Sequence, residues 1–179
     1  QIHELAARFR RSGGRSDGGE PTDAAVFREG PAPELFSAET AEALLEHLGR
    51  KTALFIEEMG YDPENICVLV PRRKELQTIT DALGEEGIET EDIRTEQFSF
   101  SSGGRVRMST LHSSKGLDFP VVMMYLPYLH RRHYYDSEQT ETLMRNLVFV
   151  GLTRAMDNLN VFIVESVDPI LMDLRAAFE

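Results

Sequence analysis

The segment RVRMSTLHSSKGLDFPVV, residues Arg105–Val122, decides the fold of this chain. Residues 105–110 alternate polar and apolar side chains, which predicts a half-buried strand. Residues 121–126, VVMMYL, are continuously apolar, the pattern of a strand covered on both faces in a parallel sheet. The loop between them holds hydroxyls, a lysine, a glycine and a carboxylate. Loops that leave the carboxyl ends of parallel strands line the ligand crevice, so this loop predicts a site for a phosphate-bearing ligand.

Strand and helix patterns alternate along the rest of the chain. Apolar runs predict further strands at 24–27, 34–36, 66–70, 88–93 and 158–164. Helices are expected after Ser37, Pro71, Ser137 and Asp168, the long third one with an apolar stripe of Leu143, Leu147 and Val150. The next position on that stripe is Arg154, which is therefore either at the helix end or directed into a site. This alternation predicts an α/β fold with a parallel sheet and right-handed crossovers.

Length and composition predict one domain with a hydrophobic core. The chain has 179 residues, of which 41% are hydrophobic. Residues 1–22 begin with a short helical pattern, run into a Gly- and Arg-rich stretch, and are expected to be a flexible N-terminal segment; residues 23–179 form the predicted domain. Since the chain starts at Gln1, we also expect it to be a fragment of a longer protein.

Cysteine content and hydropathy indicate a cytoplasmic protein. The only cysteine, Cys67, excludes an internal disulfide framework and is typical of a reducing compartment. No apolar stretch reaches the length of a membrane span, and the N-terminus lacks a hydrophobic signal core. We therefore expect no membrane partner.

The charge distribution argues against strong, autonomous binding to nucleic acid but allows local contacts. The net charge is −11, yet residues 20–100 carry 19 acids and 7 bases, whereas residues 101–179 carry 9 acids and 8 bases. The near-neutral second half can still present basic side chains to a phosphate. Residues 131–135, RRHYY, suit stacking and phosphate contacts, and equally an ordinary exposed loop.

The catalytic parts that can be excluded are as informative as those present. The sequence has no GxxxxGK[ST] phosphate loop, no acidic pair ending an apolar strand, no zinc spacing and no GxSxG elbow. What remains is Arg154, the lysine-containing loop, and the basic start of a helix at Arg72, Arg73 and Lys74. These groups can stabilise phosphoryl transfer but cannot cradle a nucleotide by themselves, so the chain holds half of an active site.

Three segments carry a resemblance to a known family. STLHSSKGLDFPVV resembles motif V of UvrD/Rep/PcrA-type superfamily 1 DNA helicases, and RNLVFVGLTRAMDNL resembles their motif VI. ICVLVPRRKELQTITDAL stands where motif IV stands. The resemblance covers residues 66–164. It implies a RecA-like fold of the P-loop NTPase type, a three-layer parallel sheet with helices on both faces, here without its own phosphate loop.

The resemblance also implies roles for individual residues. Arg154 corresponds to the motif VI arginine finger that reaches the γ-phosphate of ATP. Gly116, Asp118 and Arg73 would contribute to the nucleotide site, with Asp118 where the family has a ribose-binding Glu. The loop would have two sides, because Thr110, His112 and Ser113 match the side that faces single-stranded DNA. ATP and Mg²⁺ would be held mainly by the N-terminal RecA-like domain, the expected partner domain of the same protein.

The chain departs from the family pattern at three places. Phe149 replaces the motif VI tyrosine. Gln77 stands at the motif IV arginine, for which Arg72 or Arg73 could substitute. The short connection from Gly84 to Arg105 leaves no room for the large extra subdomain of the Rep/PcrA branch, which indicates a more compact relative.

The predicted function is the C-terminal motor domain of an ATP-dependent DNA helicase or translocase, inactive alone. The alternative is a non-catalytic helicase-like adaptor that binds DNA or protein. Outside these motifs, Arg145 is expected to form a surface ion pair rather than part of a site.

Overall fold

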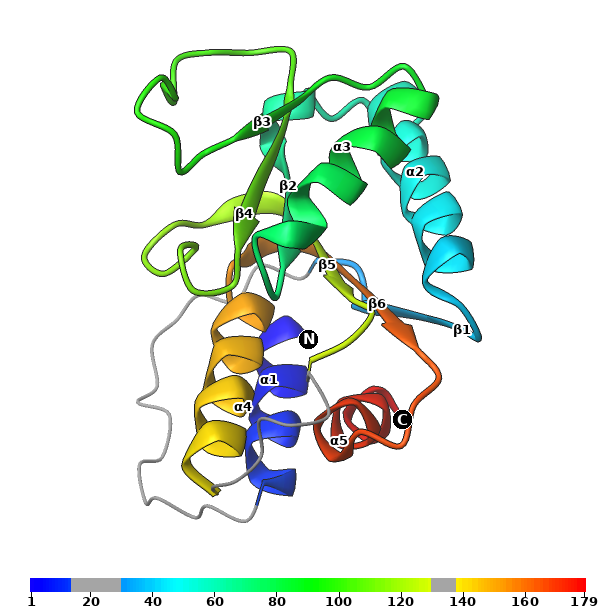
Figure 1. Ribbon diagram of the computed structural model, residues 1–179, viewed down its shortest axis with the longest axis vertical. Helices are drawn as coiled ribbons and strands as arrows, with labels where there is room; N and C mark the ends of the chain where they lie inside the picture. The colour runs from blue at the N-terminus through cyan, green and yellow to red at the C-terminus, as the bar shows by residue number, and fades with distance from the viewer. Residues whose placement is uncertain (14–29, 130–137) are drawn as a thin grey trace.

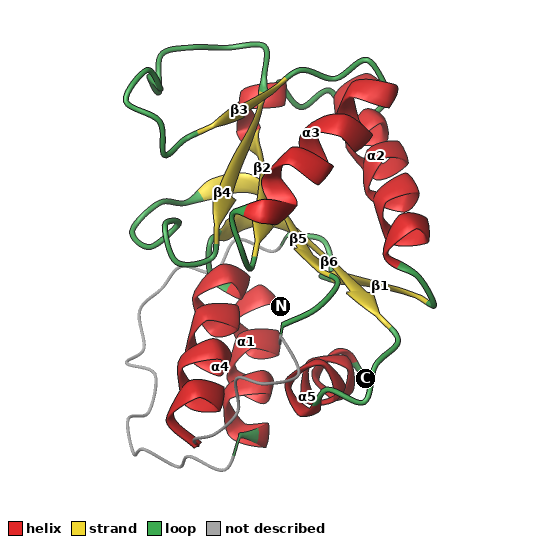
Figure 2. Ribbon diagram, viewed as in Figure 1, coloured by secondary structure: helices red, strands yellow, loops and turns green. Residues whose placement is uncertain are grey.

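The backbone forms one six-stranded parallel sheet with the strand order β1-β6-β5-β2-β4-β3 (Figures 1 and 2). The computed structural model describes residues 1–13, 30–129 and 138–179. The strands are β1 (Glu34–Ala38), β2 (Ile66–Val70), β3 (Thr90–Asp92), β4 (Val106–Thr110), β5 (Phe119–Leu126) and β6 (Ala155–Val164). The predicted α/β class and parallel sheet are confirmed. The strand predicted at 24–27 lies outside the described residues, as do Ser137 and residues 131–135.

Helices cover both faces of the sheet and make three layers (Figure 1). One face carries α2 (Ala41–Glu57) and α3 (Lys74–Glu85), and the other carries α1 (Ile2–Ser12), α4 (Glu138–Leu152) and α5 (Pro169–Phe178). A single 3₁₀ turn, η1 (Pro63–Asn65), leads into β2. Among the described residues, no helix has the length and apolar composition of a membrane span.

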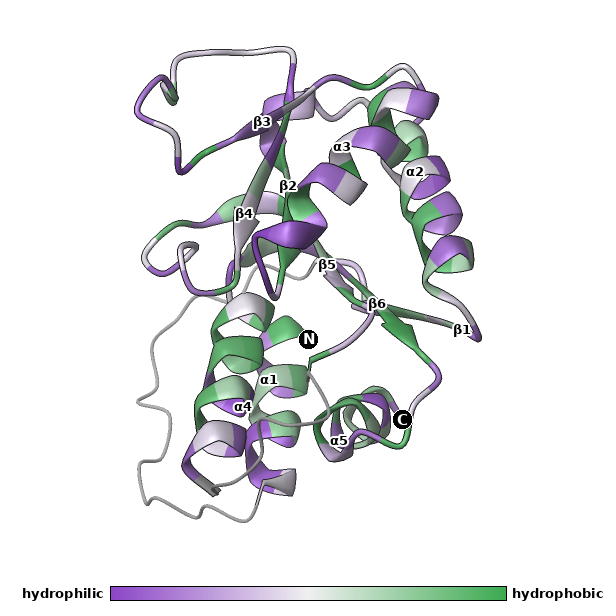
Figure 3. Ribbon diagram, in the orientation of Figure 1, coloured by the Kyte–Doolittle hydropathy of each residue, from purple (hydrophilic) through white to green (hydrophobic). Residues whose placement is uncertain are grey.

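The central strand β2 shows why the sheet needs helices on both sides. All five of its residues are buried. Ile66, Val68 and Val70 pack toward α2 and α3, whereas Cys67 and Leu69 pack toward α1, α4 and α5. Neighbouring side chains of a strand point to opposite faces, so an uninterrupted apolar run is stable only between two helical layers. The hydropathy colouring shows β2 largely in green (Figure 3).

Strand β4 corrects the prediction of a half-buried strand at 105–110. Its apolar and polar residues alternate as expected, but all five residues from Val106 to Thr110 are buried. The polar face is covered by the connection from β3, where the Arg107 guanidinium lies 5.1 Å from the ring centre of Phe100 and 5.6 Å from that of Phe98. The polar face of β4 is therefore covered by a loop instead of solvent, and the residue pattern of the strand cannot show this.

Helix α1 corrects the prediction that residues 1–22 are flexible. Residues 2–12 form a helix whose apolar face, Ile2, Leu5, Ala6 and Phe9, is buried against α4 and α5. The helical spacing noted in the sequence therefore reflects packing in the core. Residues 14–22 lie outside the described residues, so the domain boundary at residue 22 stays a prediction.

Two details of the other helices differ from the sequence expectation. Helix α2 starts after Thr40, whose hydroxyl accepts a hydrogen bond from the Ala43 amide at 3.2 Å, because Ser37 is still part of β1. In α4 the buried apolar side chains are those of Val148 and Leu152, while Leu143 is 59% exposed. The predicted stripe and the observed one both have helical spacing, so the position of the helix over the sheet determines which of them is buried.

The connection from β4 to β5 has no helix. Strands β4 and β5 lie on either side of β2, so residues 111–118 pass across β2 from the carboxyl end of β4 to the amino end of β5. We call residues 111–118 the bridge segment. Leu111 is buried beneath α4, and a Cβ atom at Gly151 would lie 2.6 Å from Leu111 Cδ2 and 2.7 Å from Met124 Cε. The glycine thus lets the helix approach the segment and the sheet.

We expect Phe9→Ala to lower the free energy of unfolding by about 3–5 kcal/mol, because the ring is fully buried between helices. Urea unfolding followed by circular dichroism measures this. The control Arg11→Ala on the exposed face of α1 should change stability by less than about 0.5 kcal/mol. Equal, small effects of both substitutions would show that α1 does not belong to the cooperative unit.

A second pair of variants tests the close approach at Gly151. Gly84→Ala in α3 meets no atom within 4 Å and should stabilise the protein by about 0.5–1 kcal/mol through helix propensity. Gly151→Ala has the same propensity gain but crowds Leu111 and Met124, which costs about 1–3 kcal/mol. Urea midpoints should therefore place Gly151→Ala below Gly84→Ala. Equal stabilisation by both would mean that the contact yields without cost.

Candidate functional site

The predicted site residues lie at two opposite edges of the sheet. Thr110 ends β4, and His112 and Ser113 follow it, while Arg73 follows β2, so these residues lie at the carboxyl edge. Asp118 and Arg154 directly precede β5 and β6 and lie at the amino edge. The loop therefore leaves the carboxyl end of β4 as expected but does not stay at that edge along its whole length. The bridge segment instead joins the two edges.

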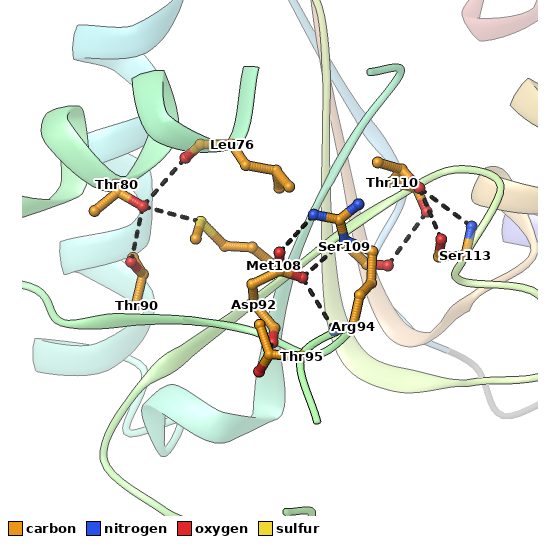
Figure 4. Close-up of polar contacts among 10 residues, drawn as sticks. All are labelled: Leu76, Thr80, Thr90, Asp92, Arg94, Thr95, Met108, Ser109, Thr110 and Ser113. Atoms are coloured by element: carbon orange, nitrogen blue, oxygen red, sulfur yellow. Dashed lines mark hydrogen bonds and ion pairs between the residues drawn. The ribbon is translucent and has the colours of Figure 1, made fainter. Parts of the chain in front are cut away.

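At the carboxyl edge the bridge segment starts with a tight polar turn (Figure 4). The hydroxyl of Thr110 donates to Ser113 Oγ at 3.1 Å and accepts from the Ser113 amide at 3.3 Å. Ser114 is fully buried and its hydroxyl donates to the Leu111 carbonyl at 2.9 Å. This turn leaves the side chains of His112 and Ser113 exposed at its tip. Thr110 itself is 6% exposed, so its first role in this structure is to hold the turn.

The basic residues after β2 divide into one anchored arginine and two exposed cations. Arg72 Nη2 donates to the Tyr128 carbonyl at 3.0 Å, and Arg72 Nε donates to Glu75 Oε1 at 3.1 Å. Arg73 and Lys74 are exposed, with Lys74 Nζ 3.8 Å from the same carboxylate oxygen. Of the two arginines considered as substitutes for a motif IV arginine, only Arg73 has a guanidinium that no described residue binds. Gln77 is hydrogen-bonded to Asp81 on the surface of α3.

An ion pair that was not predicted from the sequence lies at the carboxyl edge, at the end of β3. Arg94 Nε donates to Asp92 Oδ1 at 2.8 Å, and the Arg94 amide donates to the same oxygen at 3.0 Å (Figure 4). Burial alone would raise the pKa of Asp92, but these hydrogen bonds outweigh burial and lower it. The stabilisation from this carboxylate is therefore present at neutral pH and is lost as the pH falls through the lowered pKa.

At the amino edge Arg154 is folded back onto the end of the bridge segment. Its Nη1 lies 3.0 Å from Asp118 Oδ1 and donates to the Leu117 carbonyl at 3.3 Å. Nε donates to the Val150 carbonyl at 3.1 Å, and Nη2 donates to Thr153 Oγ1 at 3.2 Å. The Arg154 side chain is 19% exposed and that of Asp118 is 56% exposed. Of the two alternatives for Arg154, the helix end is the one observed, because α4 ends at Leu152, and a role in a site stays a prediction.

The remaining predicted residue, Gly116, serves the shape of the bridge segment. Its φ of 84° lies in the left-handed region that favours glycine, and no described atom lies within 4 Å of a Cβ built on it. Glycine is thus required by the backbone conformation rather than by close packing within the chain. The open space above Gly116 and the neighbouring Lys115 face solvent.

Arg145 takes part in the packing of helices rather than in either edge. Its guanidinium lies 2.8 Å from Asp173 on α5 and 3.3 Å from Glu141 on α4. The same group stacks over Phe9, 5.5 Å from the ring centre. Its side chain is 16% exposed, so the predicted surface ion pair is in fact a largely buried link between three helices.

The described residues supply no magnesium site. No group of three or more His, Cys, Asp or Glu side chains among them could hold a metal ion. Asp118, the acid next to Arg154, is paired with that arginine, so the donor set there does not fit a bound Mg²⁺ ion. Arg154 offers a cation to a phosphate, and the exposed Asp118 carboxylate can accept a hydrogen bond from a neutral hydroxyl.

The sequence model of the UvrD-like helicase C-terminal domain matches residues 93–166. These residues are therefore similar to that family's C-terminal domain. The matched part runs from the end of β3 through β6, so it includes the turn at Thr110, the bridge segment and Arg154. The basic start of α3 lies outside it, and the motif IV resemblance of that region stays a prediction.

The fold of the whole chain is shared with a solved structure, the C-terminal domain of a possible DNA helicase from Lactobacillus plantarum WCFS1. The TM-score is 0.66 at 21% identity, over 99% of this chain and 92% of that one. At this identity the likeness shows the fold alone. No curated protein matches the chain. The match to the UvrD-like model and the parallel three-layer fold thus agree with the sequence prediction.

We expect the Asp118–Arg154 pair to contribute little to stability, because Arg154 keeps its backbone acceptors and Asp118 is mostly exposed. A double-mutant cycle of Asp118→Ala and Arg154→Ala, measured by urea unfolding, should give a coupling energy of about 0.2–1 kcal/mol that decreases with added salt. A salt-independent coupling above about 2 kcal/mol would instead identify the pair as a structural lock.

Proposed function

We propose that this chain is the C-terminal RecA-like half of an ATP-dependent DNA helicase or translocase. The observation that carries the proposal is the bridge segment, which lies within the UvrD-like match and joins Thr110, His112 and Ser113 at one edge of the sheet to Asp118 and Arg154 at the other. A motor has to link a nucleic-acid contact to a nucleotide contact, and here both belong to one eight-residue connection, residues 111–118, and the arginine that binds its end.

In this proposal Arg154 acts as the arginine finger. An arginine directed at the γ-phosphate stabilises the charge that develops on the transferred phosphoryl group. The contacts of Arg154 suit that task, because three of its four partners are neutral oxygens, two carbonyls and one hydroxyl, and the fourth is an exposed carboxylate, all of which a phosphate can replace. Asp118, once released, would accept a hydrogen bond from the ribose, and the open backbone at Gly116 would allow the nucleotide to approach.

The carboxyl edge would hold single-stranded DNA. His112 and Ser113 are exposed at the tip of the polar turn, and the unbound guanidinium of Arg73 lies in the loop after the adjacent strand β2. Hydroxyls, an imidazole and a guanidinium are common phosphate and sugar contacts. Arg73 was predicted for the nucleotide, but its place at the carboxyl edge, away from Arg154, supports a DNA contact instead.

The chain would be inactive alone. Its sequence contains no phosphate loop, and its described residues offer no magnesium site. An N-terminal RecA-like domain would supply the phosphate loop and the metal-binding acids, and ATP would lie between the two domains. Arg154 would then complete the site by contacting the phosphate across the interface.

The test is Arg154→Ala in the protein that contains both RecA-like domains. We expect DNA-stimulated ATP hydrolysis to fall by at least about a hundredfold in kcat, because arginine fingers contribute about 10³–10⁵. Binding of a fluorescent ATP analogue should change only a few-fold. Arg154→Lys should also be impaired, because lysine lacks the planar fork. The control is Arg50→Ala, which removes an exposed ion pair with Glu46 on α2.

Normal turnover of Arg154→Ala would contradict the finger assignment. If the wild-type protein binds single-stranded DNA but hydrolyses no ATP, the alternative function, a helicase-like adaptor, is the correct one.

A further inference from the structure

Tyr128, just beyond β5, presents a large exposed aromatic ring on a fixed backbone. Its relative exposure is 53%, whereas Leu129 beside it is 3% exposed and Pro127 is buried. The two buried neighbours hold the backbone on both sides of the tyrosine. The ring stacks on no aromatic side chain among the described residues, and more than half of the residue is accessible to a ligand.

A residue in the loop after the neighbouring strand β2 also binds the backbone of Tyr128. Arg72, which follows β2, donates from Nη2 to the Tyr128 carbonyl at 3.0 Å. Arg72 is itself fixed by Glu75, whose side chain is only 8% exposed. Because Glu75 lies in the first turn of α3, the chain of contacts ties Tyr128 to a rigid helix. An exposed ring that loses little freedom on binding is a good recognition surface.

The sheet order places Tyr128 in a row with the proposed DNA contacts. Val70 at the end of β2 pairs with Thr110 of β4, and Leu69 pairs with Met124 of β5. The residues beyond these strand ends therefore lie side by side at the carboxyl edge, with Tyr128 after β5, Arg73 and Lys74 after β2, and His112 and Ser113 after β4. Adjacent strands are about 4.8 Å apart, so the row spans roughly 10 Å.

We propose that Tyr128 is a stacking platform for a base of single-stranded DNA, with Arg72 as the residue that positions it. The inference rests on the proposed DNA contact at this edge and adds the residue that would recognise the base. Aromatic rings beside cations bind single strands without sequence preference, because every base has a π face and every nucleotide a phosphate. Here the cations are Arg73 and Lys74, and the ring lies at one end of their row.

The test measures the affinity of the full-length protein for a fluorescein-labelled oligothymidylate by anisotropy at low salt. Tyr128→Ala should raise Kd roughly tenfold, as expected for one lost stacking contact. Tyr128→Phe keeps the ring and should stay within about twofold of wild type. The matched control is Met172→Ala, which removes a similarly exposed apolar side chain, 56% exposed, on α5.

Repeating the titration with an abasic oligomer separates stacking from charge. Tyr128→Ala should have no effect on this ligand, because it offers no base, whereas Arg73→Ala should weaken binding of both ligands. Arg72→Ala should lower the yield of photocrosslinking between Tyr128 and a 5-iodouracil oligomer, and Arg72→Lys should restore it only in part, because lysine lacks the planar fork that directs Nε and Nη2 to the two acceptors.

Two results would overturn the stacking role. In the first, Tyr128→Ala leaves the Kd for oligothymidylate unchanged, whereas Arg73→Ala and His112→Ala weaken binding. The proposal of a DNA contact at the carboxyl edge would then stand without the stacking role. The other is an equal loss on the abasic ligand. If none of the carboxyl-edge substitutions affects binding, the proposed DNA edge fails together with the tyrosine.

Discussion

The rest of the structure depends on one constraint, the passage of residues 111–118 across β2 without a helix. Strands β4 and β5 both pair with β2, so the connection has to lie flat on the sheet, beneath α4. This requires the small residue at Gly151, the positive φ at Gly116 and the buried hydroxyl of Ser114, which satisfies a backbone carbonyl inside the segment. The bridge segment that is held in this way runs from the carboxyl edge to the amino edge, so it links the two proposed binding edges.

The sequence allowed the strands, the family resemblance and the arginine at the end of α4 to be predicted, because each is marked by a local pattern. Positions that depend on the tertiary arrangement could not be predicted. Thr110 and Asp118 are eight positions apart in one loop, yet they lie at opposite ends of the sheet. The link from Glu75 through Arg72 to the Tyr128 carbonyl joins residues 56 positions apart and leaves no periodic signal. The buried face of α4 likewise depends on where the helix lies over β5.

Electrostatic pairing explains how a chain of net charge −11 can still offer cations at chosen points. Most of the arginines near the sheet already have an acidic partner: Arg72 with Glu75, Arg94 with Asp92, Arg107 with Glu91, Arg145 with Asp173, and Arg154 with Asp118. Among the residues that the structure describes, few exposed cationic groups lack such a close pair, and one of them, Arg73, is at the carboxyl edge. An acidic surface around a few cations favours weak, local contact with a polyanion over tight general binding.

The way the Arg154 backbone is held affects how fast its side chain can change partners during a catalytic cycle. Its carbonyl accepts a hydrogen bond from the Phe119 amide at 2.9 Å, so the backbone stays joined to β5 while the guanidinium exchanges its acceptors. A change of partner therefore needs only rotations about side-chain bonds, which for partly exposed residues take picoseconds to nanoseconds. Closure between domains takes microseconds to milliseconds. The arginine would follow the closure without delay, and the rate of the cycle would be set by the domains or by product release.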